Sequence, residues 1–200
     1  MTSETDDDYV ARMRQRKKEQ DEETRSKSIK RGVVVVNTGD GKGKSTSGFG
    51  VAIRAAGHGQ RVAVVQFIKG TWKTGEKAAL ARFPEITHVV SGDGFTWETQ
   101  DRSQDMASAR HGFDRARAFI QDGDHDVVVL DEINIALDLG YLPVEEVCRC
   151  LETKPEHVSV VLTGRNAPQE VIDSADTVTE MKMVKHAYKA GIRARKGIEF

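Results

Sequence analysis

Short β-branched runs alternate with longer polar stretches from residue 32 to the C-terminus, and the two kinds of segment predict different elements. The runs are apolar on both faces, which is typical of parallel strands buried in the middle of a domain. They lie at Gly32–Asn37, Arg61–Phe67, Ile86–Val90, Asp126–Leu130 and Val158–Thr163. The sequence therefore predicts five central strands.

The stretches between these runs carry apolar side chains at helical spacing. We expect helices at Ser45–Ala56, Thr74–Arg82, Gln104–Gln121, Pro143–Thr153 and Pro168–Ser174. Pro143 and Pro168 suit the first turn of a helix, where the missing N–H costs nothing. Strands that alternate with helices predict an α/β fold of three layers, in which helices cover both faces of a mostly parallel central sheet.

Residues 1–31 differ from the rest in composition: they are dense in charges of both signs and nearly lack large apolar side chains. Composition favours a solvated or disordered arm, because such a segment buries too little apolar surface to offset its loss of conformational entropy. The alternative is a helix that becomes ordered over a bound ligand, with Tyr9, Val10 and Met13 as a short apolar stripe. We therefore treat 1–31 as a charged N-terminal arm, a candidate cover of the active site, and 32–200 as one domain.

Length, charge and cysteine usage exclude several classes of function. The chain has 200 residues, enough for one domain with a real core, and a formal net charge of −1, so no basic excess indicates a nucleic-acid partner. No apolar run approaches the roughly 20 residues that span a bilayer, and the N-terminus lacks the plan of a secretory signal. Cys148 and Cys150 diverge on a predicted helix and suit packing. We expect a cytoplasmic protein with no membrane partner.

The segment Thr38–Thr46, TGDGKGKST, joins the first predicted strand to the first predicted helix. It resembles the phosphate-binding pattern G-x-x-x-x-G-K-[ST], but its first glycine is one place late, at Gly39. In such a loop successive backbone N–H groups point at one anion, Lys44 adds a positive charge and the Ser45 hydroxyl ligates Mg²⁺. A purely structural turn needs neither the lysine nor the G-K-S order. The sequence therefore predicts a P-loop NTPase-like, RecA-like fold.

Two further strands end in polar residues that belong at the same edge of the sheet. Asp126–Leu130 is followed by Asp131 and Glu132, which resembles a Walker B arrangement, in which a carboxylate meets the metal held by the loop. By themselves, two adjacent acids are only a polar strand end, but together with the loop they indicate a metal site. The last predicted strand leads to Arg165, which is either a phosphate contact or a surface arginine.

The shortened loop argues against ordinary phosphoryl transfer. Loss of one residue moves the backbone donors relative to Lys44, so a bound phosphate chain need not lie as it does in kinases and ATPases. Those enzymes also need a residue that positions the nucleophile. The chain has no kinase-type H-R-D signature.

The other strong local pattern is GDGFTWETQ, residues 92–100, which follows the predicted strand Ile86–Val90. A loop in this place overhangs the sheet edge. Phe95 and Trp97 either pack the loop on itself or form an apolar wall for a ligand. The flanking glycines bring the backbone close without adding bulk, which suits a flat ligand.

Six motifs in one order resemble those of the ATP:corrinoid adenosyltransferases of the cobalamin pathway. They are GDGKGKST, VVQFIKGTW, GFTWETQ, VVLDEIN, VVLTGRN and a tail from Val184–Tyr188 to Lys196–Phe200, so the similarity runs from about Gly32 to the C-terminus. The resemblance implies transfer of the 5′-deoxyadenosyl group of ATP to the Co(I) centre of a corrinoid, with release of triphosphate. It also implies that ATP lies reversed in the shortened loop. Co(I) is already a nucleophile without a proton, so no general base is expected.

The resemblance implies a role for each part of the loop. The triphosphate would be held by Gly39, Asp40, Gly41, Lys42, Gly43, Lys44, Ser45 and Thr46. Lys44 would neutralise the leaving group, and Ser45 would bind Mg²⁺ (or Mn²⁺) together with Glu132 or Asp131, of which Glu132 is favoured.

Other expected contacts come from outside the loop. Asn37 and Arg54 would be further nucleotide contacts, and Phe95 and Trp97 would lie under the corrin ring and exclude its lower axial base. The resemblance also implies a flavoprotein-type electron donor and a homodimer. The corrinoid itself is cobalamin, cobinamide or cobyrinic acid diamide.

The sequence is also compatible with two other functions. One is a P-loop ATPase or kinase in which the aromatic motif only packs, and this alternative yields ADP rather than triphosphate. The other is a nucleotide-gated protein that carries a corrinoid without chemistry, and it forms no cobalt–carbon bond.

Overall fold

A computed structural model of the chain describes residues 5–68, 75–91 and 101–199. The chain divides into two compact units, Met1–Lys30 and Arg31–Phe200. The larger unit contains the sheet and every described residue of the predicted phosphate loop and strand ends.

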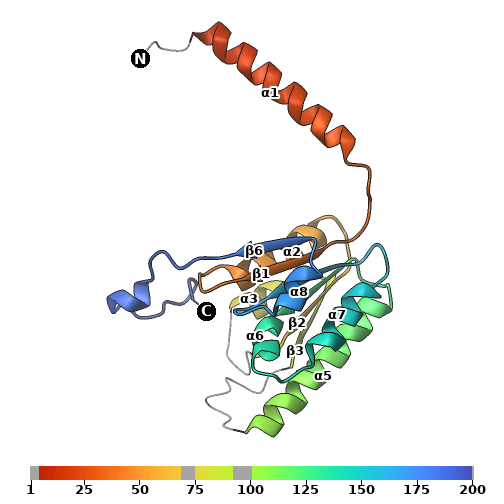
Figure 1. Cartoon of the computed structure of the whole chain (residues 1–200). Coiled ribbons are helices and arrows are strands. Elements are labelled where there is room, and N and C mark those ends of the chain that lie inside the picture. Colours follow the sequence, from red (N-terminus) through yellow and green to blue (C-terminus); the bar gives the residue numbers. More distant parts are fainter. Residues whose placement is uncertain (1–4, 69–74, 92–100, 200) are drawn as a thin grey trace. The chain divides into compact units, whose positions relative to one another are not determined.

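All six strands of the sheet run parallel, in the order β3-β2-β4-β5-β1-β6 (Figure 1). The strands are β1 (Val34–Thr38), β2 (Val62–Gln66), β3 (Ile86–Val90), β4 (Val127–Asp131), β5 (Ser159–Thr163) and β6 (Thr177–Glu180). β5 lies between β1, which precedes the phosphate loop, and β4, which leads into the carboxylate pair. Because the strands are parallel, their carboxyl ends meet at one edge of the sheet, where α/β proteins bind ligands.

Helices cover both faces of the sheet, which gives three layers (Figure 1). One face carries α2 (Lys44–Gly57) and α3 (Gly75–Leu80), and the other carries α5 (Arg102–Gln121), α6 (Ile133–Asp138), α7 (Val144–Glu152) and α8 (Gln169–Asp173). Alternate residues of a strand point to opposite faces, so Val62 and Val64 pack in the α2 layer while Ala63 and Val65 pack in the α5 layer. The predicted α/β architecture is confirmed.

Three elements of the described chain are missing from the sequence prediction. β6 lies at the edge of the sheet beside β1 and has no buried residue, so its TVTE sequence lacks the apolar run that marks the other strands. α6 has six residues and begins directly after Glu132. A helix this short shows no helical period in the sequence. A 3₁₀ turn, η1 (Ala187–Ala190), follows β6.

Several predicted bounds need correction. β4 includes Asp131. α5 begins at Arg102, earlier than predicted, because the Asp101 side chain accepts hydrogen bonds from the first backbone N–H groups of the helix. Pro143 and Pro168 occupy the residue before their helices rather than the first turn.

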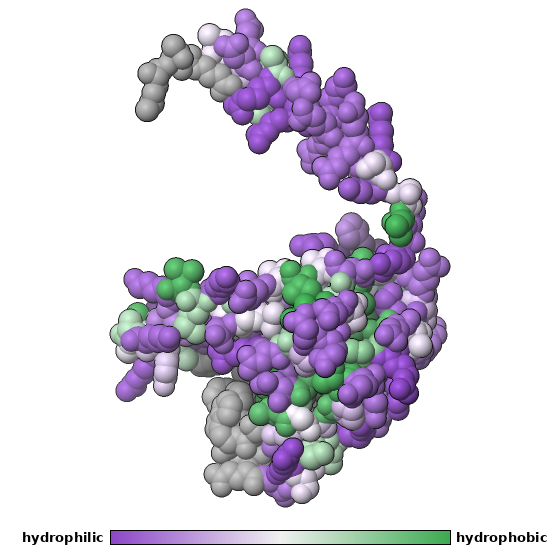
Figure 2. All heavy atoms as spheres, in the orientation of Figure 1, coloured by the Kyte–Doolittle hydropathy of each residue, from purple (hydrophilic) through white to green (hydrophobic). Residues whose placement is uncertain are grey.

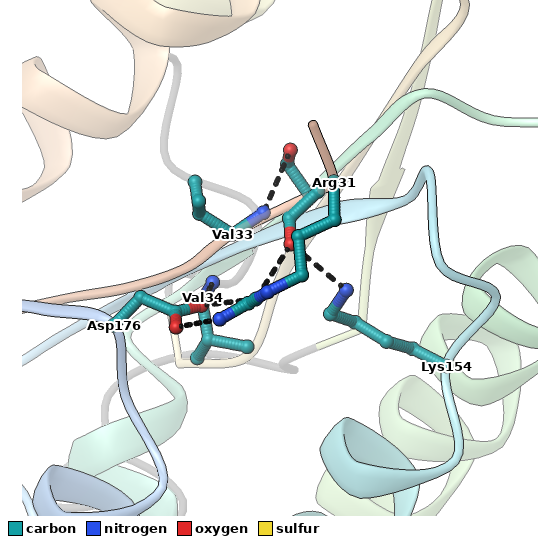
Figure 3. Close-up of polar contacts among 7 residues, drawn as sticks. Arg31, Val33, Val34, Lys154 and Asp176 are labelled. Atoms are coloured by element: carbon teal, nitrogen blue, oxygen red, sulfur yellow. Dashed lines mark hydrogen bonds and ion pairs between the residues drawn. The ribbon is translucent and has the colours of Figure 1, made fainter. Parts of the chain in front are cut away.

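A polar cluster around Asp176 holds the amino end of β1, at the opposite end of the strand from the phosphate loop (Figure 3). Asp176 lies just before β6 and accepts from the Arg31 guanidinium and from the backbone N–H of Val34. Lys154 donates to the carbonyl of Gly32 at 3.2 Å. This cluster ties the start of the edge strand to the start of β1.

The smaller unit contains one helix, α1 (Asp6–Ser26), none of whose residues is buried. Its start is a capping box, because Thr5 and Asp8 each accept the other's backbone N–H, at 3.2 and 3.3 Å. The face of α1 in view in Figure 2 is mostly hydrophilic. The structure shows a helix with no buried residue, which fits a solvated arm as well as a cover, and both alternatives stay predictions. No described helix is long and apolar enough to cross a membrane.

Candidate active site

The phosphate loop occupies the turn between β1 and α2. Asn37 is buried near the end of β1, and its side-chain amide donates to the Ser47 hydroxyl at 3.4 Å. Gly43 is the residue before α2 and has a φ of +112°, a backbone conformation that suits glycine. Lys44, Ser45 and Thr46 then form the first turn of the helix. The strand, loop and helix N-terminus therefore have the order that an anion site requires.

The phosphate loop packs against the segment that follows β6. The backbone N–H of Gly41 donates to the carbonyl of Met181 at 2.6 Å. A Cβ at Gly39 or Gly41 would lie 2.6 or 2.7 Å from the same oxygen, so neither position has room for a side chain. Sequence reasoning assigned these glycines to the anion alone. It missed the Met181 contact because neither β6 nor its continuation was predicted.

The ammonium group of Lys44 turns back toward the loop. Its Nζ donates to the carbonyl of Gly41 at 2.5 Å. Partial burial lowers the pKa of Lys44, and the nearby charge of Arg165 lowers it further, whereas the carboxylates of Asp40 and Glu132 act in the opposite direction. The charges of the loop, of the β4 end and of the β5 end therefore act on one lysine, which makes these three strand ends a single site.

The two carboxylates at the end of β4 lie in different environments. Asp131 is fully buried, and its two oxygens accept from the Thr163 hydroxyl at 2.7 Å and from the Gln66 amide at 2.9 Å. Glu132 is half-buried and has a φ of +65°, a left-handed conformation that costs a non-glycine residue on the order of 1 kcal/mol. The Glu132 carboxylate is among the charges that act on the pKa of Lys44, whereas both oxygens of Asp131 are engaged within the sheet. This difference favours Glu132 over Asp131 as the metal-binding carboxylate.

Two further cations border the loop, and each has an acidic neighbour within the chain. Arg165 follows β5, and its Nε lies 3.9 Å from the Asp40 carboxylate. Lys42 forms an ion pair with Glu199 from the C-terminal segment. The structure therefore brings Arg165 to the loop, as the phosphate-contact alternative requires, and a bound anion would compete with these carboxylates for both cations.

Arg54 lies in the last turn of α2 and is exposed. At a rise of 1.5 Å per residue, it is roughly 15 Å along the helix axis from Lys44. This position is remote from the loop, and the contact of Arg54 with the nucleotide stays a prediction.

The oxygen donors at this edge fit Mg²⁺. Hydroxyl and carboxylate oxygens are hard ligands, and Mg²⁺ in nucleotide sites takes one or two of them and completes its shell with phosphate oxygens and water. Ser45 in the first turn of α2 and Glu132 after β4 supply such a pair at the same edge of the sheet, from strands on either side of β5.

Phe95 and Trp97 lie outside the described residues, as does the whole segment 92–100. Their predicted role therefore stays a prediction. A hollow of about 530 Å³ opens beside the start of α5, and it is lined by Met106, Ala107, Arg110, Gly140, Tyr141, Leu142 and Pro143. No residue of the phosphate loop lines it, so it is distinct from the anion site.

The sequence matches the family described as ATP:corrinoid adenosyltransferase BtuR/CobO/CobP over residues 30–200. A corrinoid adenosyltransferase of Pseudomonas aeruginosa is 50% identical over 172 residues, which are 86% of this chain and 85% of the relative. The corrinoid adenosyltransferase CobA of Salmonella typhimurium is 42% identical over 171 residues, which are 86% of this chain and 87% of the relative.

Among solved structures, the assembled ATPase EscN from the type III secretion system of enteropathogenic Escherichia coli has a TM-score of 0.45 and 17% identity. The similarity covers 75% of this chain and 42% of that ATPase. The match to the family over residues 30–200 and the relatives at 42 and 50% identity agree with each other. The chain belongs to the ATP:corrinoid adenosyltransferase family.

Proposed function

We propose that this chain transfers the 5′-deoxyadenosyl group of ATP to the Co(I) centre of a corrinoid and releases triphosphate. In this reaction the cobalt electron pair forms a bond to C5′ of the ribose while the C5′–O bond breaks. The departing oxygen keeps the bonding pair and leaves as triphosphate, and cobalt is formally oxidised from Co(I) to Co(III). No proton moves, so the site needs charge stabilisation rather than a general base.

The observation that carries this proposal is the hydrogen bond from Gly41 to Met181. In an ordinary phosphate loop the backbone N–H groups cradle the β- and γ-phosphates for attack at phosphorus. Here the loop is one residue shorter, and one of its N–H groups is already bonded to a backbone carbonyl. The loop therefore offers its remaining donors in a different arrangement, which supports its use as a grip on a leaving triphosphate.

Each residue of the site then has a role in binding or stabilising that leaving group. The loop from Gly39 to Thr46 holds the triphosphate, and Lys44 neutralises the charge that develops on the departing oxygen. Ser45 and Glu132 hold Mg²⁺, or Mn²⁺ in its place, which when bound withdraws charge from the phosphate oxygens. Asn37 and Arg54 contact the remainder of the nucleotide.

The corrinoid end of the site consists of Phe95 and Trp97. Their aromatic side chains offer cobalt no donor atom, so a corrin ring seated on them lacks a lower axial ligand. Removal of that ligand makes Co(II) easier to reduce. The family pattern around GFTWETQ supports this role.

Four finer features belong to the proposal; family resemblance supports the first two, and the composition of the chain supports the location and the cover. They are a homodimer, a flavoprotein-type electron donor, a cytoplasmic location, and a cover over the corrinoid formed by residues 1–31. Sedimentation of the purified chain tests the homodimer. A single species with the mass of one chain would contradict it.

The test is incubation of the full chain with ATP, Mg²⁺ and chemically reduced cob(I)alamin. We expect a light-sensitive alkylcobalt spectrum and one triphosphate for each corrinoid converted. ADP and phosphate without an alkylcobalt product would support the ATPase or kinase alternative. Binding of both ligands without a new cobalt–carbon bond would support the carrier.

A further inference from the structure

A chain of hydrogen bonds crosses four neighbouring strands, from the middle of β3 to the carboxyl ends of β2, β4 and β5. His88 Nε2 on β3 lies 2.8 Å from Gln66 Oε1 on β2, and Gln66 Nε2 donates to Asp131 on β4 at 2.9 Å. Thr163 on β5 donates to the other oxygen of Asp131 at 2.7 Å. The same hydroxyl oxygen accepts the backbone N–H of Glu132 at 2.9 Å. We call these five residues the strand-end relay.

The chemistry of the groups fixes the direction of each bond in the relay. A carboxylate only accepts, so Gln66 must present its NH₂ to Asp131 and its carbonyl oxygen to His88. His88 then carries its proton on Nε2. Burial, followed by the charge of Lys77, lowers the pKa of His88, which keeps the ring neutral at pH 7.

The relay is buried at its centre and therefore holds one arrangement. Gln66 is 3% exposed, and Asp131 and Thr163 are 0% exposed. A buried polar group without a partner is costly, so each of these groups keeps the bond that it has. Thr163 is the link between the buried carboxylate and Glu132, because its hydroxyl donates to one and accepts from the other.

The backbone of Glu132 needs a hydrogen bond that holds its conformation. Its left-handed backbone is unfavourable for a residue with a side chain, and this conformation persists only where the surroundings hold it. The turn at Glu132 also sets where the carboxylate points, because α6 begins at the next residue. The bond from its N–H to Thr163 lies directly at this turn.

We propose that Thr163 and Gln66 are positioning residues that orient the Glu132 carboxylate toward the metal site. The inference rests on the proposed function, in which Glu132 and Ser45 hold the metal. Thr163 fixes the amide of Glu132, and Gln66 fixes the carboxylate of Asp131 on which Thr163 depends. Neither side chain touches the metal or the nucleotide in this account.

The test uses the full chain, inorganic triphosphate and Mn²⁺, with free Mn²⁺ measured by its electron paramagnetic resonance signal. Thr163→Val keeps the shape and removes the hydroxyl, and we expect a weakening of Mn²⁺ retention by about tenfold or more, as is usual when the partner of a metal ligand is lost. Thr163→Ser restores the hydroxyl and should retain Mn²⁺ within a few-fold of the unaltered chain. Thr153→Val is the control. It removes a hydroxyl at the end of α7 that is bonded to Arg149 and Gln121, and Mn²⁺ retention should stay as it is in the unaltered chain.

A second variant tests the same inference in case Thr163→Val does not fold, and thermal unfolding is measured for each protein. Gln66→Met keeps the length of the side chain and leaves the bond between Glu132 and Thr163 in place, so we expect a smaller loss of Mn²⁺ retention. For both variants the adenosylation rate should recover at saturating Mn²⁺, which a general loss of structure would not allow. Unchanged Mn²⁺ retention in folded Thr163→Val, or in folded Gln66→Met if Thr163→Val does not fold, overturns the inference. An unaltered chain that fails to retain Mn²⁺ with triphosphate overturns the proposed metal site itself.

Discussion

The guanidinium of Arg31 donates to both carboxylate oxygens of Asp176, from Nη1 at 2.9 Å and from Nη2 at 2.5 Å (Figure 3). This bidentate pair, with the backbone N–H of Val34 as a third donor at 2.8 Å, lowers the pKa of Asp176 to about 2. The pair joins the first residue of the larger unit to the residue that precedes the last strand.

Asp176→Asn should lower the free energy of unfolding at pH 7 by about 1 kcal/mol, a value reduced for the exposure of Arg31 to solvent. The pKa of Asp176 is depressed, so its contribution is present above the ordinary carboxyl pKa and is lost as pH falls through about 2. Urea unfolding at several pH values checks this prediction. The difference in the free energy of unfolding between Asp176→Asn and the unaltered chain should shrink between about pH 4 and pH 2.

The control for this prediction is Asp173→Asn on α8, whose exposed carboxylate accepts from the neighbouring Gln169 side chain on the same helix. It should change stability little at any pH. If the free energies of unfolding of Asp176→Asn and the unaltered chain differed by the same amount at every pH, the stabilising role assigned to the Asp176 carboxylate would be wrong.

Lys44→Ala should reduce adenosylation by roughly a hundredfold, because loss of one preorganised electrostatic contact costs on the order of 3 kcal/mol in the transition state. The fold should persist, since Lys44 is only partly buried and its side chain donates to the loop carbonyl of Gly41. Steady-state kinetics with saturating Mg²⁺ATP and circular dichroism check both parts. Near-normal turnover in the variant would show that the loop is not the triphosphate site.

Glu199→Gln should bind inorganic triphosphate several-fold more tightly than the unaltered chain. The Glu199 carboxylate pairs with Lys42 on the phosphate loop, so it competes with a bound anion for that cation. Titration calorimetry at low and high salt measures the effect, which should be smaller at high salt because the pair is partly exposed. Glu156→Gln, which alters an exposed glutamate outside the loop, should leave triphosphate affinity as it is.

Removal of residues 1–30 should leave the melting temperature of the larger unit nearly unchanged, because α1 buries none of its residues. Corrinoid turnover should fall if the arm excludes water from the reactive cobalt. Unfolding curves and adenosylation kinetics of the truncated chain separate the two effects. Unchanged kinetics would leave the arm as a solvated helix without a role in catalysis.

Phe95→Ala and Trp97→Ala should slow the reaction that starts from Co(II) and a flavin-type reductant far more than the reaction that starts from chemically prepared Co(I). In the proposed function the aromatic wall acts on the reduction step, because it would exclude an axial ligand, and alkylation itself would not need the wall. Lys44→Ala should fail in both assays and serves as the comparison. Equal losses in both assays, with ATP still bound, would assign these rings to general corrinoid binding.

Much of the geometry around the phosphate loop was predictable from local sequence. The strand before Thr38, the glycines, Lys44 and the carboxylates after β4 are close in sequence to the elements that place them, so short patterns identify them. β6 was not predictable, because an exposed edge strand has no apolar run, and the role of Met181 depends on β6. The strand-end relay was hidden for a related reason: Gln66, His88 and Thr163 come from three strands, and only the sheet order makes them neighbours.

β1 comes first among the strands of the chain, but its partners in the sheet are the last two strands, β5 and β6. The phosphate loop follows β1 and depends on the carbonyl of Met181, which follows β6. A ribosome therefore makes the loop early and its support late, and pairing across such a long stretch of chain is slow to form. The nascent chain therefore carries the phosphate-loop sequence without the Met181 carbonyl that supports it until the segment after β6 has been made.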